Sequence, residues 1–213
     1  RAGSKFKMRK GERIISSTSG FNTDSLLCFS KKGRYYKVKL KDIELNTPIQ
    51  LETVCGCDSN EEICEITTVN KEDKNKIIIF ATKDGYIKKS KVIDYANGKK
   101  TGALALKLNE GDEVISILPI HKDTDEVAVF SKSGLGKKCK LTEFSLQARG
   151  GKGLLVYKTD DAEGKTLVGA EMLSNEDNLL LIGNKTSICI SAVDVPTLSR
   201  TGIGNILIKN NIL

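Results

Sequence analysis

Apolar and polar residues alternate in short runs along most of this chain, and the runs come in pairs that flank a turn. Residues 76–82 read KIIIFAT and residues 86–90 read YIKKS, with Gly85 in the turn between them. Residues 127–138 repeat this plan around Gly134. A period near two, β-branched and aromatic residues, and a glycine-bearing turn together predict β-hairpins. Because no segment sustains a 3.6-residue period, we predict an all-β protein.

A unit of about 51 residues recurs through the chain. Its first marker is a glycine, an apolar run and a closing lysine, in the segments GALALK, GLLVYK and GNILIK that begin at Gly102, Gly153 and Gly204. Its second marker is the large apolar residue near the end of the first hairpin strand: Phe29, Phe80, Phe130 and Ile182. The intervals are 51 and 51 for the first marker, and 51, 50 and 52 for the second. Two markers with one period indicate four copies of one supersecondary unit, which must stack on its neighbours to bury a core.

Each unit also contains a short helical or looped stretch (91–96 and 140–146), the glycine-started strand, and a last strand such as 114–118. Four strands in a unit of this size is the content of a propeller blade. We therefore predict a single domain over 1–213, a propeller-like disc of about four blades of four strands each. Its parts are an N-terminal arm at 1–10 and repeats at 11–69, 70–122, 123–175 and 176–213.

The last repeat stops at Leu213, where the other repeats begin their last strand. Either the N-terminal arm, which contains Phe6 and Met8, supplies that strand, or the ring is left open. Closure by strands from both termini has a physical motive, because it removes exposed sheet edges.

The chain of 213 residues is 39% hydrophobic and 29% charged, and no apolar run in it is long enough to span a membrane. The sequence shows no signal-peptide pattern and its cysteines follow no common spacing, so we expect a reduced, cytoplasmic protein without a membrane partner. Cys55, Cys57 and Cys64 lie close in sequence. A zinc site needs four ligands, however, and the only histidine, His121, has no partner at ligand spacing. We therefore expect ordinary thiols and no metal site.

The net charge is +7, and its distribution carries more information than its size. The windows from each hairpin turn to the repeated glycine hold 15 Lys/Arg against 5 Asp/Glu; they are 33–51, 85–102, 134–153 and 186–204. A charge that recurs at one position of a stacked repeat lies along one rim, so we predict a basic belt that follows a phosphate backbone. The belt residues are Arg34, Lys37, Lys88, Lys89, Lys99, Lys100, Lys137, Lys138 and Arg200. The alternative is a solvated surface whose lysines protect edge strands.

The segment 147–153 reads QARGGKG. It resembles the gyrase-A box, QRRGGKG, of the C-terminal domain of the bacterial DNA gyrase A protein, with Ala148 where the box has a basic residue. Segments 24–33, 80–90 and 107–117 are similar to the blade motifs of that domain and of its equivalent in the topoisomerase IV A protein. The resemblance covers nearly the whole chain. It implies a β-pinwheel, a propeller-like disc whose blades exchange strands, that bends or wraps double-stranded DNA around its rim.

By the same resemblance, the partners are double-stranded DNA, the rest of the gyrase A or topoisomerase IV A protein, and the separate ATPase subunit of the enzyme. The strand-passing tyrosine, ATP and Mg belong to other parts of such an enzyme, so we expect no catalytic residue, no cofactor and no small-molecule substrate in this domain. In the box-like loop we expect DNA contacts from Gln147, Arg149, Gly150, Gly151 and Lys152. The alternative is a plain turn whose glycines serve only positive φ angles.

Two other functional classes need to be distinguished from DNA bending. A propeller-type scaffold that binds acidic protein partners would share the basic rim. An enzyme in its own right would need an acid–base or nucleophile constellation, and the sequence contains none that we recognise. Binding to the DNA backbone is set apart by a strong dependence on salt and by insensitivity to base sequence.

Overall fold

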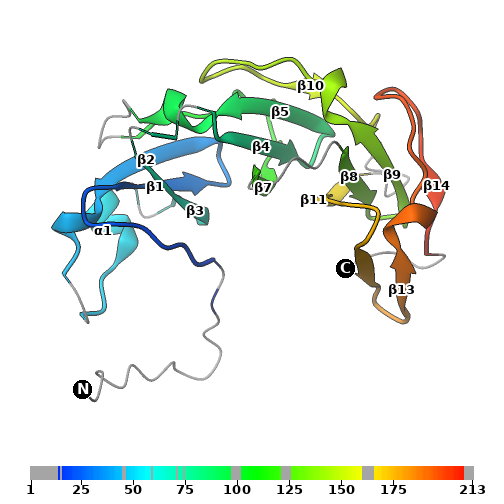
Figure 1. Ribbon diagram of the computed structural model, residues 1–213, viewed down its shortest axis with the longest axis horizontal. Helices are drawn as coiled ribbons and strands as arrows, with labels where there is room; N and C mark the ends of the chain where they lie inside the picture. Colours follow the sequence, from blue (N-terminus) through cyan, green and yellow to red (C-terminus); the bar gives the residue numbers. More distant parts are fainter. Residues whose placement is uncertain are drawn as a thin grey trace.

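The computed structural model describes residues 14, 16–44, 47–58, 60–70, 72–73, 75–96, 102–120, 126–159 and 166–208. These residues form an arc of antiparallel β-sheets arranged one after another, with a convex outer side and a concave inner side (Figure 1). The all-β prediction is confirmed. Besides strands, the arc contains one helix of five residues, α1 (Leu51–Cys55), and four short 3-10 turns.

Three of the sheets have four strands each. The first has the order β3–β1–β2–β6 and contains β1 (Ser25–Ser30), β2 (Arg34–Lys39), β3 (Ile63–Val69) and β6 (Ala103–Leu104). The second has the order β10–β5–β4–β7 and contains β4 (Ile77–Thr82), β5 (Tyr86–Lys91), β7 (Val114–Ile120) and β10 (Leu154–Leu155). The third has the order β11–β8–β9–β14 and contains β8 (Glu126–Ser131), β9 (Leu135–Lys140), β11 (Leu167–Met172) and β14 (Asn205–Ile206).

In each four-stranded sheet, the short edge strand comes from the repeat that follows. The two-residue strands β6, β10 and β14 lie in the segments that begin at Gly102, Gly153 and Gly204. Each pairs with the second hairpin strand of the preceding repeat, as Leu104 does with Arg34 and Leu155 with Tyr86. The expectation of four strands within each repeat is therefore corrected: three strands are local and the fourth is exchanged.

The glycine in each hairpin turn receives this exchanged segment. The carbonyl of Gly85 accepts hydrogen bonds from the N–H groups of Val156 (2.8 Å) and Tyr157 (3.3 Å). The carbonyls of Gly33 and Gly134 accept equivalent pairs of hydrogen bonds in the repeats before and after. Gly85 has a φ of +84°, and a Cβ there would lie 2.0 Å from the Tyr157 carbonyl oxygen. Only glycine fits at this contact. The turn glycine and the glycine-started segment recur together because they meet in space.

The hydrophobic core lies between neighbouring sheets. Phe29 and Tyr35 of the first sheet pack against Phe80 of the second and against Tyr95, which lies in the 3-10 turn η2 (Val92–Tyr95). The Phe29 and Phe80 rings meet edge to face with centroids 5.4 Å apart, a favourable arrangement for aromatic pairs. Similar clusters join the second sheet to the third, and the third to the last hairpin. Each repeat thus completes its core only by stacking.

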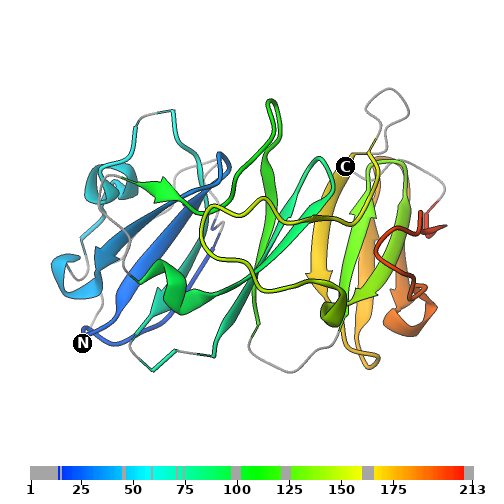
Figure 2. The same cartoon turned by 90° about the horizontal axis from the view of Figure 1, so that it is seen from above.

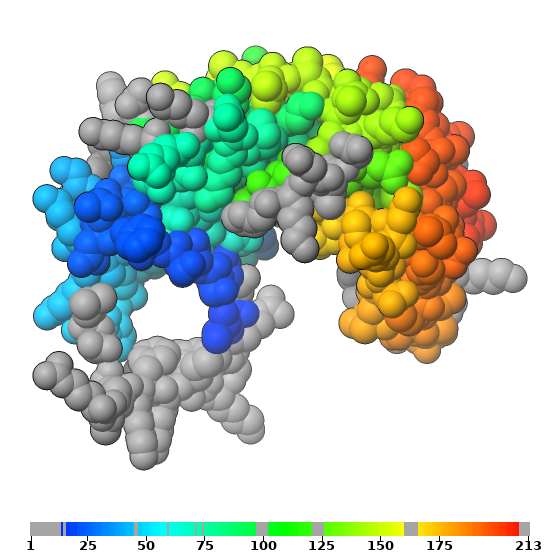
Figure 3. All heavy atoms as spheres, viewed as in Figure 1, coloured from blue at the N-terminus to red at the C-terminus, as the bar shows by residue number. Residues whose placement is uncertain are grey.

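Within the described residues, the fourth unit is a hairpin, β12 (Asn178–Ile182) and β13 (Ser187–Ser191), rather than a four-stranded blade. Among the described residues no strand joins it to the first sheet, and the two ends of the arc stand apart in the space-filling view (Figure 3). The open alternative for the ring is the one observed. The N-terminal arm at 1–10, the other candidate for the missing strand, lies outside the described residues. No helix within the described ranges has the length and hydropathy needed to cross a membrane.

Candidate nucleic-acid interface

Three lysines of the predicted basic belt are buried. Lys88, Lys137 and Lys138 have exposed fractions of 1%, 0% and 3%. The prediction treated every basic residue of the windows as a surface charge, and for these three it was wrong. Their strands, β5 and β9, lie within the sheets, and the side chains turn into the stack of repeats. They are therefore unable to reach a phosphate in this structure.

Lys88 is held by oxygen atoms and aromatic rings. Its Nζ donates to the carbonyl of Ala105 (2.6 Å) and to the Tyr95 hydroxyl (3.0 Å). The same atom lies 5.4 Å from the Phe80 ring centroid and 5.5 Å from that of Tyr95, a cation–π arrangement. Burial lowers the pKa of Lys88 to about 8, and the charge of Asp94 opposes this shift. Lys88 therefore ties the second sheet to the segment that its own repeat contributes to the first sheet.

Lys137 and Lys138 also make contacts within the protein. Lys137 Nζ donates to the carbonyls of Ser199 (3.0 Å) and Arg200 (2.7 Å) in the following repeat. Burial lowers the pKa of Lys137. Lys138 Nζ lies 3.1 Å from Glu126 Oε2, so its charge is paired inside the same sheet. These contacts explain why lysine recurs at this place in the repeat without a nucleic acid.

Lys89 directly follows Lys88 on β5, and Lys37 is the equivalent residue on β2. Each of the two is half-buried. Lys37 Nζ donates to the carbonyl of Ala96. Lys89 Nζ donates to the carbonyl of Leu141 (2.7 Å), and burial lowers its pKa. Their ammonium groups are therefore partly engaged in joining one repeat to the next. Lys99 and Lys100 lie outside the described residues.

The box loop, residues 147–153, is fastened at both ends by Gln147. The Gln147 N–H donates to the carbonyl of Lys89 (2.8 Å), and the Gln147 carbonyl accepts from the hydroxyl of Ser90 (2.7 Å). Its side-chain oxygen accepts from the N–H of Gly153 at 3.0 Å. Gln147 therefore shapes the loop, and these contacts take up its side-chain oxygen and both of its backbone polar groups.

The two glycines in the middle of the box loop dock on the exchanged segment of the preceding repeat. The Gly150 N–H donates to the carbonyl of Ala105 (3.2 Å), and the Lys107 N–H donates to the carbonyl of Gly151 (3.2 Å). Gly150 has a φ of +73°, which favours glycine. Gly151 is needed for another reason: a Cβ there would lie 2.5 Å from the Gln147 side-chain oxygen. The loop has a structural role, and its backbone is largely committed to it.

The cations of the box loop, by contrast, are exposed. Arg149 Nη1 donates to the Tyr35 hydroxyl at 2.5 Å. An arginine has five N–H donors, so this bond leaves the guanidinium oriented and able to bind a second group. Lys152 Nζ lies 4.6 Å from the centroid of the Tyr86 ring. Both side chains therefore contact aromatic residues of the preceding sheets, while their charged groups face solvent.

The fourth-repeat loop, residues 198–204, places the partly exposed Arg200 in a similar setting. Arg200 Nη1 donates to the carbonyl of Leu155 at 2.5 Å, and its backbone N–H donates to Glu143 Oε2 at 2.7 Å. Arg34, at the other end of the arc, is exposed and its Nε lies 3.8 Å from Glu61 Oε1. Among the predicted residues, the structure thus leaves Arg34, Arg149, Lys152 and Arg200 with charged groups accessible to solvent.

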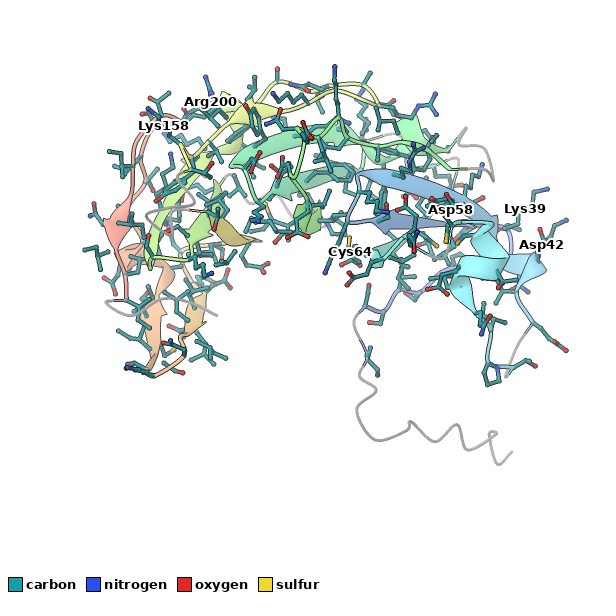
Figure 4. The ribbon with its side chains drawn as sticks, turned by 180° about the vertical axis from the view of Figure 1, so that it is seen from behind. Lys39, Asp42, Asp58, Cys64, Lys158 and Arg200 are labelled. Carbon is teal, nitrogen blue, oxygen red and sulfur yellow. The ribbon has the colours of Figure 1, made fainter. Side chains whose placement is uncertain are left out.

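Several exposed cations escaped the prediction. Lys107 and Lys158 close the repeated apolar segments and are exposed. Lys158 lies with Arg200 on the convex side of the arc (Figure 4). The sequence marks both residues as a lysine that recurs at a constant interval. The windows in which charge is counted end at the repeated glycine, five residues before that lysine. Seen from above, the box loop and the fourth-repeat loop cross the convex face over the second and third sheets (Figure 2).

Within the described ranges, no group of three or more His, Cys, Asp or Glu residues is placed to hold a metal ion. Cys28 and Cys55 are buried together with Tyr36 and Val38 in an apolar cluster of the first sheet. Burial raises the pKa of the Cys64 thiol to about 11, which disfavours the reactive thiolate.

Comparisons with known proteins agree with this fold. The family model described as DNA gyrase C-terminal domain, beta-propeller, matches residues 24–47, 76–121, 125–165 and 190–211, more than half of the chain. The DNA gyrase A protein of Clostridium acetobutylicum is 29% identical in an alignment that covers 88% of this chain and 29% of that protein. The DNA gyrase A protein of Helicobacter pylori is also 29% identical, over 93% of this chain and 24% of that protein. The chain spans less than a third of the length of these relatives.

Among solved structures, the C-terminal domain of E. coli ParC superposes with a TM-score of 0.76 at 15% sequence identity. The match covers 88% of this chain and 78% of that chain. At this identity the similarity shows a shared fold. It agrees with the exchanged strands and the stacked sheets described above.

Proposed function

This chain belongs to the DNA gyrase C-terminal domain family, and on that premise we propose that it binds double-stranded DNA along its convex side and bends it. The observation that carries the proposal is a set of solvent-accessible cations: Lys158 and Arg200 on the convex side (Figure 4), and Arg149 and Lys152 in the box loop that crosses it (Figure 2). A curved surface that neutralises phosphates on one side of a duplex favours a bend toward that surface.

The two arginines are suited to phosphate because they are held in advance. Arg149 uses one N–H on the Tyr35 hydroxyl and Arg200 uses one on the Leu155 carbonyl. Each guanidinium keeps further donors for the bidentate geometry of a phosphate group. Holding the side chain before DNA arrives lowers the conformational entropy lost on binding.

The basic belt of this proposal is sparser than the one predicted from the charge count. The stack of repeats is stabilised by the buried Lys88, Lys137 and Lys138. The cations that solvent can reach lie instead in the loops and at the lysines that close the repeated segments. Because the accessible cations are few and face a curved backbone, we expect no readout of base sequence. We expect the fourth-repeat loop to contribute less than the box loop, because Ile203 stands where the box loop has Lys152.

In the whole protein, we propose that this domain is an accessory of an ATP-dependent type IIA topoisomerase. The rest of the gyrase A or topoisomerase IV A protein and the separate ATPase subunit would be its partners, with ATP and Mg bound outside this chain. Its place would be the cytoplasm, on the nucleoid. The family match and the similarity to the gyrase A protein over part of that protein's length support this proposal.

The experiment is a titration of DNA binding against salt for the parent chain, Arg149→Ala/Lys152→Ala, and Arg200→Ala. For the parent, the logarithm of the association constant should fall linearly with the logarithm of salt concentration. We expect the double variant to reduce the magnitude of the slope by about two and Arg200→Ala by about one, with the fold retained. Unrelated duplexes of equal length should bind within about tenfold of each other.

A scaffold for acidic proteins would give a different result. The parent would then show weak binding to duplex DNA with no slope that depends on Arg149 and Lys152. A protein that binds one sequence more than about tenfold better than others would contradict backbone-directed binding. Either outcome would remove the proposal.

A further inference from the structure

Exposed aliphatic side chains recur once per repeat at the outer edge of the sheets. Leu104, Leu155 and Ile206 are spaced by 51 and 51 residues, and their exposed fractions are 42%, 39% and 65%. Each is the second residue of an exchanged two-residue strand. After Leu104 and after Leu155 the next two residues are buried, so the outward position is well defined. We call Leu104, Leu155 and Ile206 the edge aliphatics.

The regularity of the edge aliphatics sets them apart from chance surface hydrophobics. Single exposed leucines are common on protein surfaces. An edge strand, however, usually carries charged or polar residues on its outer face, because these discourage association with other chains. Here the same repeat position is aliphatic three times, on a side of the molecule that is rich in cations.

Leu104 lies beside the box loop. A Cβ at Gly150 would lie 3.5 Å from Leu104 Cδ2, and the Gly150 N–H donates to the carbonyl of the next residue, Ala105. Arg149 precedes this glycine and reaches Tyr35, which faces Ala103 in the strand register. The exposed Leu104 side chain and the Arg149 guanidinium therefore belong to one small surface.

Leu155 repeats the arrangement in the next sheet. Its carbonyl accepts the hydrogen bond from Arg200 Nη1 at 2.5 Å. Arg200 stands 51 residues after Arg149, as Leu155 stands 51 residues after Leu104. In both places an arginine from one repeat rests beside a leucine that an earlier repeat exchanges.

We propose that Leu104 and Leu155 contact the deoxyribose groups of bound duplex DNA, while the neighbouring arginine binds the adjacent phosphate. This rests on the proposed function. Each DNA strand presents charged phosphates and less polar sugars in alternation, and proteins contact both without reading sequence. A leucine next to an oriented guanidinium matches that alternation. The leucines thus add an apolar, salt-independent component to binding that is otherwise electrostatic.

The test is a salt titration of DNA binding for Leu104→Ala/Leu155→Ala beside Arg149→Ala/Arg200→Ala. Apolar contact releases no counterions. The leucine variant should therefore bind about tenfold more weakly at every salt concentration, with an unchanged slope. The arginine variant should make the slope shallower, reducing its magnitude by about two. Leu180→Ala, an exposed leucine on β12, should have no effect.

Methyl NMR of the parent chain gives a second measurement that needs no variant. With labelled leucine methyls and a bound duplex, nuclear Overhauser effects should connect Leu104 and Leu155 to deoxyribose protons, and Leu180 should show none. Absence of these effects in a bound complex, or a leucine variant that binds as the parent does, would overturn the inference and leave the proposed function standing. Loss of self-association in the leucine variant, with DNA binding unchanged, would assign the leucines to a protein contact instead. A parent that does not bind DNA would remove the proposed function itself.

Discussion

The box loop at 147–153 and the fourth-repeat loop at 198–204 occupy the same place in consecutive repeats but are held differently. The box loop is fastened by its own side chain, Gln147, and by backbone bonds to the exchanged segment around Ala105. The fourth-repeat loop is fastened from below by buried Lys137, which donates to the carbonyls of Ser199 and Arg200. One repeat position therefore supports two ways of tying blades together.

The difference originates in one aromatic residue. Lys88 and Lys137 are equivalent in the repeat, but Lys88 faces Tyr95 whereas the matching residue near Lys137 is Phe144. The Tyr95 hydroxyl gives the Lys88 ammonium an oxygen partner, and the Ala105 carbonyl gives it another. Phe144 offers no such oxygen. A buried ammonium must still be satisfied, and Lys137 finds its partners in the loop carbonyls.

The largest effect that this comparison predicts is for Lys137→Met. The change leaves the carbonyls of Ser199 and Arg200 without their buried donor, so the free energy of unfolding should fall by about 3 kcal/mol. Chemical denaturation followed by circular dichroism measures this. The control is Lys140→Met, an exposed lysine on the same strand, which should change stability by less than about 0.5 kcal/mol. Equal losses in the two variants would mean that Lys137 does not hold the loop.

Lys88→Met should change the pH dependence of stability. The pKa of Lys88 in the folded chain is about 8, below its usual value of about 10.4. Between these values the unfolded chain binds more protons, so the free energy of unfolding rises with pH. In the variant, the rise between pH 7.5 and 9.5 should be smaller by about 2 kcal/mol.

The measurement for Lys88→Met is urea denaturation at several pH values below 9.5, with Lys91→Met, an exposed lysine on the same strand, as the control. Burial raises the pKa of Cys64 and Tyr95, which makes stability fall at alkaline pH, but these groups are present in parent and variant alike. A parent and a variant with parallel pH profiles would contradict the assignment of the shift to Lys88.

The smallest predicted effect distinguishes the glycines of the two loops. A Cβ at Gly151 would lie 2.5 Å from the Gln147 side-chain oxygen and would displace it from the Gly153 N–H. At Gly202, the equivalent position, the nearest atom is Leu198 Cβ at 3.1 Å. We expect Gly151→Ala to cost about 1 kcal/mol more than Gly202→Ala, because the half-buried Gly153 N–H loses its partner. Thermal unfolding of both variants tests this, and a reversed order would contradict the role given to Gln147.

Hairpins, repeat period and the all-β class could be predicted because they depend on local chemistry. The turn glycines and the alternating strands carry that information within ten or so residues of each other. The five-residue helix α1 was missed, since it is too short to show a helical period. The exchange of the short strands came only from the family resemblance, because a segment such as 102–107 carries no mark of the sheet that it joins.

The sequence by itself determined that this protein is a stack of similar β units, with a surplus of cations toward one part of the first three units. A period and a charge count are additive properties, and they survive without knowledge of contacts. Only the tertiary structure decided which cations are available. Lys88, Lys89 and Lys91 are nearly adjacent on β5, yet they are buried, half-buried and exposed in that order. The direction of each side chain is fixed by the pleat of the strand and by the packing of the next repeat. Neither can be deduced from the residue types of the strand alone.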